Sequence, residues 1–179
     1  MKSLPATQPV RVWDPFVRCF HWSLVGCVLL NFVVEEGEAL HRVLGYAASG
    51  LVGARILWGF VGTRYARFAG CFPTPAQLRQ HFANLLAGRE TPYVGHNPAG
   101  AAMMLALMTC VLLLGLTGHL QTTESLGDSE ALEEVHEALA SGLLGLAGLH
   151  AAAALVMGWL EGTNLIGAMI TGVKRRKVR

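Results

Sequence analysis

The stretch EEVHEALASGLLGLAGLHAAAALVMGWL at residues 133–160 decides the fold of this chain. It is long and apolar enough to cross a bilayer as one helix, since a span needs about 20 mostly apolar residues. It contains His136 and His150, which are just under four helical turns apart, so both lie on nearly one face and differ in depth by about 21 Å. Ionisable side chains inside a bilayer are costly and are usually functional. The stretch therefore predicts a membrane helix with two functional positions.

Three further apolar stretches are similar in length, so we expect four spans, at about residues 15–34, 41–61, 98–120 and 133–160. No small-residue cleavage site follows the first stretch, so we expect it to stay as a helix. The composition agrees, because 53% of the residues are hydrophobic and 15% are charged, whereas a soluble domain has about 25% charged residues. The sequence therefore predicts an all-α, integral membrane four-helix bundle, in which residues 1–179 form a single domain.

The charges in the loops, at the chain ends and at the edges of these stretches are segregated by sign. The chain ends and the loop between the second and third stretches are basic, whereas the other two loops are acidic. The basic residues are Arg11, Arg18, Arg64, Arg67, Arg79, Arg89, Lys174, Arg175, Arg176, Lys177 and Arg179. The acidic residues are Glu35, Glu36, Glu38, Glu124, Asp128, Glu130, Glu133 and Glu134. Under the positive-inside rule, this pattern predicts a multi-pass protein whose N- and C-termini are both cytoplasmic.

With this orientation, four histidines fall at two membrane depths. His21 and His150 lie toward the cytoplasmic side, and His41 and His136 lie at the outer side. Paired neutral imidazoles suit a haem iron bound on both axial sides, whereas no cysteine or carboxylate completes a tetrahedral zinc set. A lone membrane histidine can instead simply hydrogen-bond a neighbouring helix. The matched depths favour haem ligation, by His21 with His150 and by His41 with His136.

Two arginines lie beside these expected sites. Arg55 is at the depth of the inner pair, where it either snorkels to the interface or offers a cation to a haem propionate or a quinone oxygen. Arg42 follows His41 and either serves an outer propionate or is a boundary charge. Glycines near the histidines leave room for a flat ring or simply for close helix packing. These glycines are Gly26, Gly45, Gly142 and Gly145.

The remaining histidines carry weaker signals. His96 precedes the third span at the inner face, so we expect a capping or interfacial role there, or a proton relay near a quinone. His119 ends the third span close to the outer site, but we prefer His136 as the ligand because it shares a helix face with a second ligand. His81 lies in the loop between the second and third spans and is expected to be solvated.

Local signals add three further expectations. Residues 75–86 have the spacing of a short interfacial helix, and Asn97-Pro98 is typical of an N-cap followed by proline at the first helical position. The cysteines form no C-x-x-C pattern, which excludes a zinc ribbon and covalent c-type haem attachment. We expect them to be small packing residues. They are Cys19, Cys27, Cys71 and Cys110.

Several segments of the chain resemble one known family. They are VRVWDPFVRCFHW at 10–22, LHRVLGY at 40–46, ARILWGFVGTRYARF at 54–68, GHNPAGAAM at 95–103, EEVHEALA at 133–140, GLH at 148–150 and NLIGAMITGVKRR at 164–176. In order and spacing, over nearly the whole chain, they resemble bacterial cytochrome b561, including the related b-type cytochrome subunits of nickel-iron hydrogenases. The resemblance implies a four-helix bundle with two b haems, and electron transfer linked to the quinone pool. It also implies four axial ligands, which are His21, His41, His136 and His150.

Together these observations predict transmembrane electron transfer in the bacterial inner membrane. Electrons would pass between a periplasmic redox protein and a quinone such as ubiquinone or menaquinone. The acidic outer loops favour a basic partner, for example a c-type cytochrome. Three alternatives are superoxide oxidation with quinone as acceptor, a membrane anchor for a hydrogenase or dehydrogenase, and a transporter with a proton or metal path. Membrane lipid is an expected partner, and nucleic acid is not.

Overall fold

The computed structural model describes residues 7–34, 38–69, 72–89 and 93–177. The elements run in the order β1 (Thr7–Arg11), α1 (Pro15–Asn31), α2 (Ala39–Val61), α3 (Pro75–Leu86), α4 (Pro98–Leu120), α5 (Glu130–Glu161), α6 (Leu165–Thr171) and β2 (Val173–Lys177). The molecule is thus mostly helical, as expected. The expected helix at residues 75–86 is confirmed as α3.

All the helices except α2 begin where short polar side chains satisfy the first free backbone N–H groups. Asp14 caps α1, Asn97 caps α4 and Ser129 caps α5, each by accepting a hydrogen bond from a backbone nitrogen three residues later. Thr74 and Gln77 form a reciprocal capping box at α3. The predicted N-cap at Asn97 is therefore confirmed.

Three of the helices are long and apolar enough to cross a membrane. Within the described part of the chain these are α2, α4 and α5. Their bounds agree closely with the second, third and fourth expected spans. Helix α1 has 17 residues and ends at Asn31, before the expected limit of the first span. A fourth crossing by α1 therefore stays a prediction.

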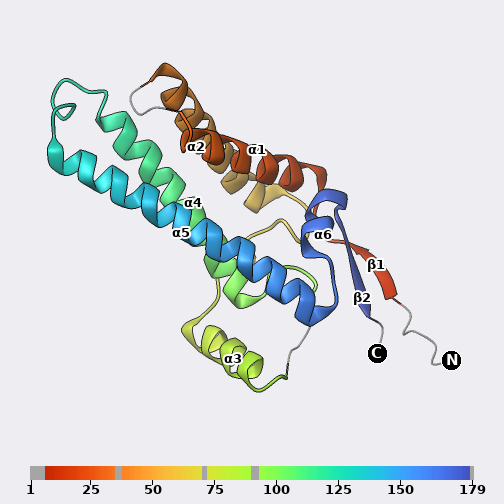
Figure 1. The fold of residues 1–179 in the computed structure, drawn as a ribbon. Coiled ribbons are helices and arrows are strands. Elements are labelled where there is room, and N and C mark those ends of the chain that lie inside the picture. The colour runs from red at the N-terminus through yellow and green to blue at the C-terminus, as the bar shows by residue number, and fades with distance from the viewer. Residues whose placement is uncertain (1–6, 35–37, 70–71, 90–92, 178–179) are drawn as a thin grey trace.

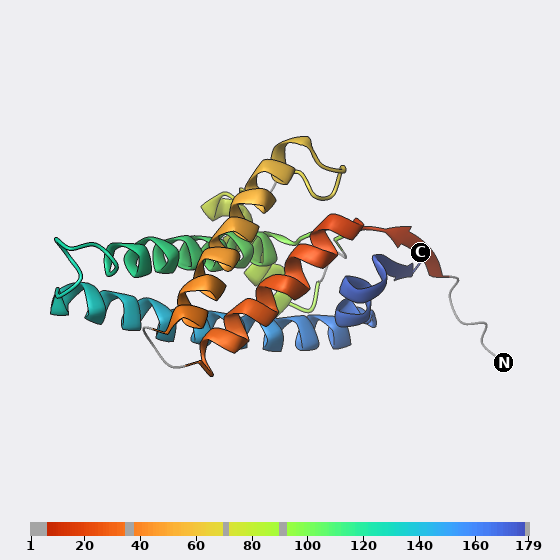
Figure 2. The ribbon, with the colours of Figure 1, turned by 90° about the horizontal axis from the view of Figure 1, so that it is seen from above.

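The long helices pack as two pairs. Helix α1 packs against α2, α4 packs against α5, and α2 contacts α4 to join the pairs. Figure 1 shows α4 and α5 running side by side in opposite directions, and Figure 2 shows the same pair from above. Because His136 and His150 are 14 residues apart along α5, they lie at two levels of the bundle.

The core lies where α2 crosses α4. Its buried members are Ala48, Val52, Phe68, Ala101, Met108, Val111 and Leu143. Gly115 makes the crossing close, because a Cβ there would collide with the hydroxyl of Ser49. Many large apolar side chains outside this core are exposed, including Leu57, Phe60, Leu155 and Trp159. Such extensive apolar surface suits the hydrocarbon of a membrane.

A small sheet, absent from the all-α expectation, joins the two ends of the chain. Strand β1 pairs with β2 in antiparallel register, with Thr7 opposite Lys177 and Arg11 opposite Val173. Gly172, at a φ of 82°, ends α6 and turns the chain into β2. Figure 1 shows this sheet at the end of the molecule opposite the turn between α4 and α5. Both ends of the chain therefore lie on one side of the bundle.

Candidate functional site

The first histidine pair joins α1 to α5. The ring centroids of His21 and His150 lie 6.4 Å apart, with 53° between the ring planes. Trp22 contacts the His21 ring edge to face, at a centroid distance of 5.0 Å. Two helices that are far apart in the sequence thus bring their imidazoles together, as the matched depths predicted.

The second pair joins α2 to the opposite half of α5. The ring centroids of His41 and His136 also lie 6.4 Å apart, with 55° between the planes. Helix α4 supports this pair, because Oγ1 of Thr117 lies 2.7 Å from Nδ1 of His136. The two pairs therefore have nearly the same geometry at two levels of the bundle.

The spacing of both pairs fits a metal held between them. An imidazole nitrogen binds a metal at about 2 Å, so two imidazoles on opposite sides of one iron place their ring centres about 6 Å apart. Within the described residues, Nδ1 of His21 and Nδ1 of His41 are buried without a hydrogen-bond partner. No protein group in this part of the chain engages either Nδ1, so each imidazole can still offer a ring nitrogen to a metal. The donor set thus fits a haem iron at each pair.

The glycines near the histidines face open space. A Cβ added at Gly26, Gly142 or Gly145 would meet nothing within 4 Å, and one at Gly45 would meet only the amide nitrogen of Asn31 at 3.8 Å. These positions are therefore not required for close helix packing within the described chain. The open space at these glycines suits a flat macrocycle as well as lipid.

Arg55 is buried in α2, and its charge acts on Asp14 and His96. Its side chain is 1% exposed, so protein groups enclose the guanidinium. Its Nη2 donates a hydrogen bond of 2.9 Å to the carbonyl of Ala66, and its guanidinium lies 4.9 Å from the ring centre of Phe68. Arg55 thus fastens the segment after α2 against the bundle and leaves a positive charge inside it.

His96 lies at the entry to α4, where its ring contacts Trp13 edge to face at a centroid distance of 4.8 Å. Burial, together with the nearby positive charge of Arg55 and the neighbouring His150, lowers the pKa of His96 to about 4. The ring is therefore neutral at pH 7. A neutral imidazole can both donate and accept a proton, so the suggested relay role stays open.

Asp14, which the sequence reading missed as a site residue, is buried where α1 begins. Its carboxylate accepts hydrogen bonds from Thr63 and Trp58 as well as from the backbone N–H of Val17. Burial raises its pKa, but these three hydrogen bonds and the charge of Arg55 outweigh that effect and hold the pKa below its usual value. Its position before Pro15 was the available signal, because Asp-Pro is typical of a helix start.

The expectation that His81 is solvated was wrong. This histidine lies inside α3 and is 8% exposed, with its ring 5.8 Å from that of Tyr93. The error arose because the same residues were considered both as a loop and as a helix. An amphipathic helix buries one face, and His81 is on that face.

Two polar residues lie near the second pair. His119 is exposed, and its Nδ1 shares a hydrogen bond of 3.0 Å with the hydroxyl of Tyr46. It is thus joined to α2 through Tyr46 rather than placed opposite His41. Arg42 is exposed beside His41. Its suggested role toward a propionate stays a prediction.

The cysteines are free where the structure describes them. Cys27 and Cys110 pack against the core, as expected for small apolar residues, whereas Cys19 is exposed. Cys71 lies outside the described residues, as do Glu35, Glu36 and Arg179.

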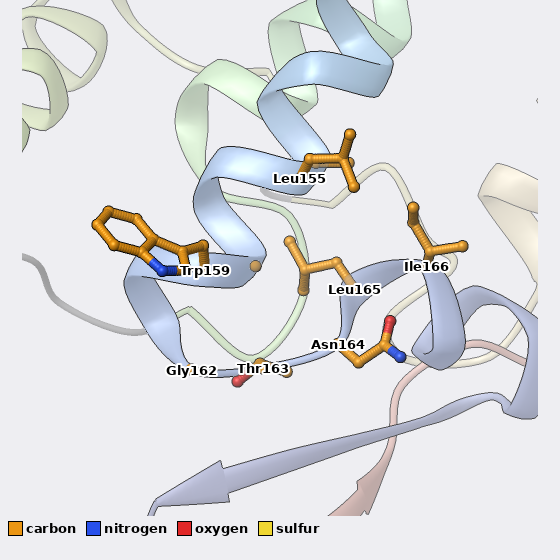
Figure 3. Close-up of a pocket in the computed structure, with 9 residues that line it drawn as sticks. Leu155, Trp159, Gly162, Thr163, Asn164, Leu165 and Ile166 are labelled. Atoms are coloured by element: carbon orange, nitrogen blue, oxygen red, sulfur yellow. The ribbon is translucent and has the colours of Figure 1, made fainter.

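A pocket lies apart from the histidines, between the end of α5 and α6 (Figure 3). Its volume is about 370 Å³, and its lining includes Leu155, Trp159, Leu165 and Ile166. None of the paired histidines lines it. The candidate site is therefore defined by the two imidazole pairs rather than by this pocket.

Comparison with known proteins identifies the family. The family model for prokaryotic cytochrome b561 matches residues 12–172, which is most of the chain. No curated protein and no solved structure matches it. The matched region contains all four paired histidines. The chain therefore belongs to the prokaryotic cytochrome b561 family, whose members are membrane proteins that bind b-type haem and transfer electrons across the membrane.

Proposed function

We propose that this chain holds two b haems, one between His21 and His150 and one between His41 and His136. The haems connect a periplasmic redox protein to the quinone pool of the bacterial inner membrane. The single observation that carries the proposal is the ring separation of 6.4 Å, which recurs in both pairs. The same separation arising twice, at two levels of one bundle, supports two ligand sites of one kind.

Each pair supplies two imidazole ligands. A haem held by both imidazoles of a pair would supply one-electron redox chemistry, because the two histidines would take the positions that an oxygen substrate needs. The pairs therefore favour passing an electron over activating oxygen. Helix α5 contributes one ligand to each pair, and the two ligands are separated by about 21 Å along the helix. The chain thus holds two redox centres at fixed levels.

The buried polar residues near the first pair support a quinone at that end. The guanidinium of Arg55 is a permanent positive charge, and His96 is a neutral imidazole close to it. A cation stabilises the negative charge that develops on a quinone oxygen during reduction. The neutral imidazole can relay the proton that the reduced quinone needs, by accepting one at one ring nitrogen as it releases one from the other.

The acidic residues near the second pair support a basic partner. Glu124, Asp128, Glu130 and Glu133 are exposed in the α4–α5 turn and the first turn of α5. Negative charge is also favourable at the N-terminus of α5, because the helix dipole is positive there. Such a surface steers a positively charged protein toward it and makes the encounter rate salt-dependent.

The proposal is tested by counting haem. Purified protein should show a b-type reduced-minus-oxidised spectrum with two haems per chain. His21→Ala and His150→Ala should each remove one haem, and His41→Ala and His136→Ala should each remove the other. His119→Ala is the matched control, because this histidine lies near the second pair but is expected to leave both haems in place.

Two results would contradict the proposal. One is a pattern of haem loss that does not sort into the pairs His21–His150 and His41–His136. The other is rapid quinone reduction by superoxide with no protein partner present, which would replace the periplasmic protein as the electron donor.

A further inference from the structure

The hydroxyl of Thr117 has an unusually well-defined set of neighbours. Thr117 lies in the last two turns of α4 and is 8% exposed. Its Oγ1 is 2.7 Å from Nδ1 of His136, 2.9 Å from the carbonyl oxygen of Leu113 and 3.2 Å from that of Leu114. One small buried hydroxyl thus connects a candidate haem ligand to the backbone of another helix.

These neighbours allow an arrangement that suits a metal-binding histidine. The carbonyl oxygen of Leu113 can only accept, and the hydroxyl of Thr117 can donate its one hydrogen there. The hydroxyl oxygen is then free to accept from Nδ1–H of His136. A histidine that is protonated at Nδ1 carries its lone pair on Nε2, and the hydrogen bond at one nitrogen sets the state of the other. In this arrangement His136 is the tautomer that offers Nε2 as a ligand.

A second feature of α4 fixes where the His136 ring lies. A Cβ added at Gly118 would approach Cε1 of His136 to 3.2 Å, which is closer than ordinary van der Waals contact. The ring therefore rests against a position that has no side chain. Thr117 and Gly118 together form a seat for His136, one residue through a hydrogen bond and the other through the space it leaves.

The seat distinguishes His136 from two of the other paired histidines. Within the described chain, Nδ1 of His21 and Nδ1 of His41 are buried and have no hydrogen-bond partner. A ligating histidine whose second nitrogen donates a hydrogen bond becomes a stronger electron donor, and such partners tune metal affinity and redox potential. Thr117 thus acts on one site and not on the other.

We infer that Thr117 is a positioning residue for the haem at His41–His136, and that it lowers the midpoint potential of that haem by hydrogen-bonding His136. The inference rests on the proposed function, because it requires haem at this pair. Stronger donation from Nε2 favours the ferric state of iron. Removal of the hydroxyl therefore raises the potential of this haem and leaves that of the haem at His21–His150 unchanged.

The experiment compares Thr117→Val with Thr117→Ser in the full chain, using spectroelectrochemical titration and haem quantification. Valine keeps the shape of threonine but cannot accept the hydrogen bond, whereas serine keeps the hydroxyl. Loss of such a partner typically weakens binding about 10- to 100-fold. A tenfold loss confined to ferric haem raises a one-electron potential by about 59 mV. We expect this rise only in Thr117→Val, and only for the haem that His41→Ala removes.

The outcomes separate this inference from the proposed function. Selective loss of that haem in Thr117→Val, with both haems retained in Thr117→Ser, also supports the inference. Unchanged potentials in Thr117→Val with two haems bound, or equal shifts in both variants, would overturn it and leave the two-haem proposal standing. Wild-type protein with no haem at His41–His136 would overturn both. If Thr117→Val does not fold, Gly118→Ala tests the same seat, since it must shift the same haem and spare the other.

Discussion

The indole Nε1 of Trp58 donates a hydrogen bond of 3.0 Å to Oδ2 of Asp14, and this bond ties the last turn of α2 to the start of α1. The same carboxylate oxygen accepts a hydrogen bond of 2.6 Å from the hydroxyl of Thr63. His21 lies about two turns into α1. The bond between Asp14 and Trp58 therefore helps to set the height at which His21 meets α5.

Replacement of Asp14 should destabilise the fold. Asp14→Ala removes a helix cap and two side-chain hydrogen bonds to a buried carboxylate, which together are worth roughly 3 kcal/mol. Asp14→Asn keeps an oxygen acceptor for the cap and should cost about half as much. Thermal unfolding in detergent, followed by circular dichroism, measures the difference. Equal melting temperatures for the wild type and Asp14→Ala would contradict this role.

The same residue predicts a loss of stability in acid. Hydrogen bonds and the charge of Arg55 outweigh burial and keep the pKa of Asp14 below its usual value in the folded protein. The unfolded chain therefore takes up this proton first. The stabilisation is complete above the unfolded pKa of about 3.9 and is lost as the pH falls through the folded pKa. Thermal unfolding measured at a series of pH values should show that Asp14→Asn loses less stability in acid than the wild type does.

His96 predicts a separate pH window. Burial, then the charges of Arg55 and His150, lower the pKa of His96 to about 4, from an ordinary value of 6.5. The unfolded chain binds the extra proton between these values, so stability should fall as the pH drops from 6.5 to about 4 and then level off for this group. His96→Gln should therefore reduce the pH dependence of the melting temperature over this range. If the melting temperature of His96→Gln changed with pH as steeply as that of the wild type, His96 would not titrate in this way.

Gly59 is predicted to tolerate no side chain. A Cβ there would collide with the ring of Phe68, which stacks on Arg55. Gly59→Ala should therefore cost about 1–3 kcal/mol through overpacking. The matched control is Gly50→Ala in the same helix, where a Cβ meets nothing within 4 Å and alanine should add up to about 1 kcal/mol of stability. Comparable melting temperatures for the two variants would refute the close approach of Phe68.

The acidic surface near the second pair predicts salt-dependent electron transfer. The triple change Glu124→Gln, Asp128→Asn and Glu130→Gln should slow reaction with a basic c-type cytochrome about tenfold at low ionic strength. The difference should shrink as salt screens the charges. Stopped-flow absorbance of haem reduction measures the rate. Arg79→Gln on α3, an exposed charge on another part of the molecule, is the control and should leave the rate unchanged.

Much of the fold was predictable because helix length, caps and apolar runs are local properties. The bounds of α4 match the expected third span. Asn97 caps the start of this helix, Pro98 occupies its first position, and the apolar run ends at Leu120. The strands β1 and β2 were missed because each is short and basic and lacks an alternating apolar pattern. Their pairing depends on the two chain ends meeting, which no local signal records.

The candidate site was also predictable only in part. The spacing of His136 and His150 along one apolar run determined that both lie on one helix face, because helix periodicity fixes the angle between residues. The burial of Arg55 was not predictable. The seat formed by Thr117 and Gly118 was not predictable either, because a threonine in a helix usually bonds only its own backbone. Only the packing of α4 against α5 brings that hydroxyl to His136.

The sequence by itself determined the apolar helices, their caps and the spacing of His136 and His150 along one helix, since these follow from local chemistry and a fixed rise per residue. Only the tertiary structure decided which imidazoles face one another at 6.4 Å and which hydroxyl supports one of them. The rotation and tilt of each helix are set by side chains that meet across the bundle, such as Gly115 with Ser49. Those contacts join residues far apart in the chain, and no local pattern encodes them.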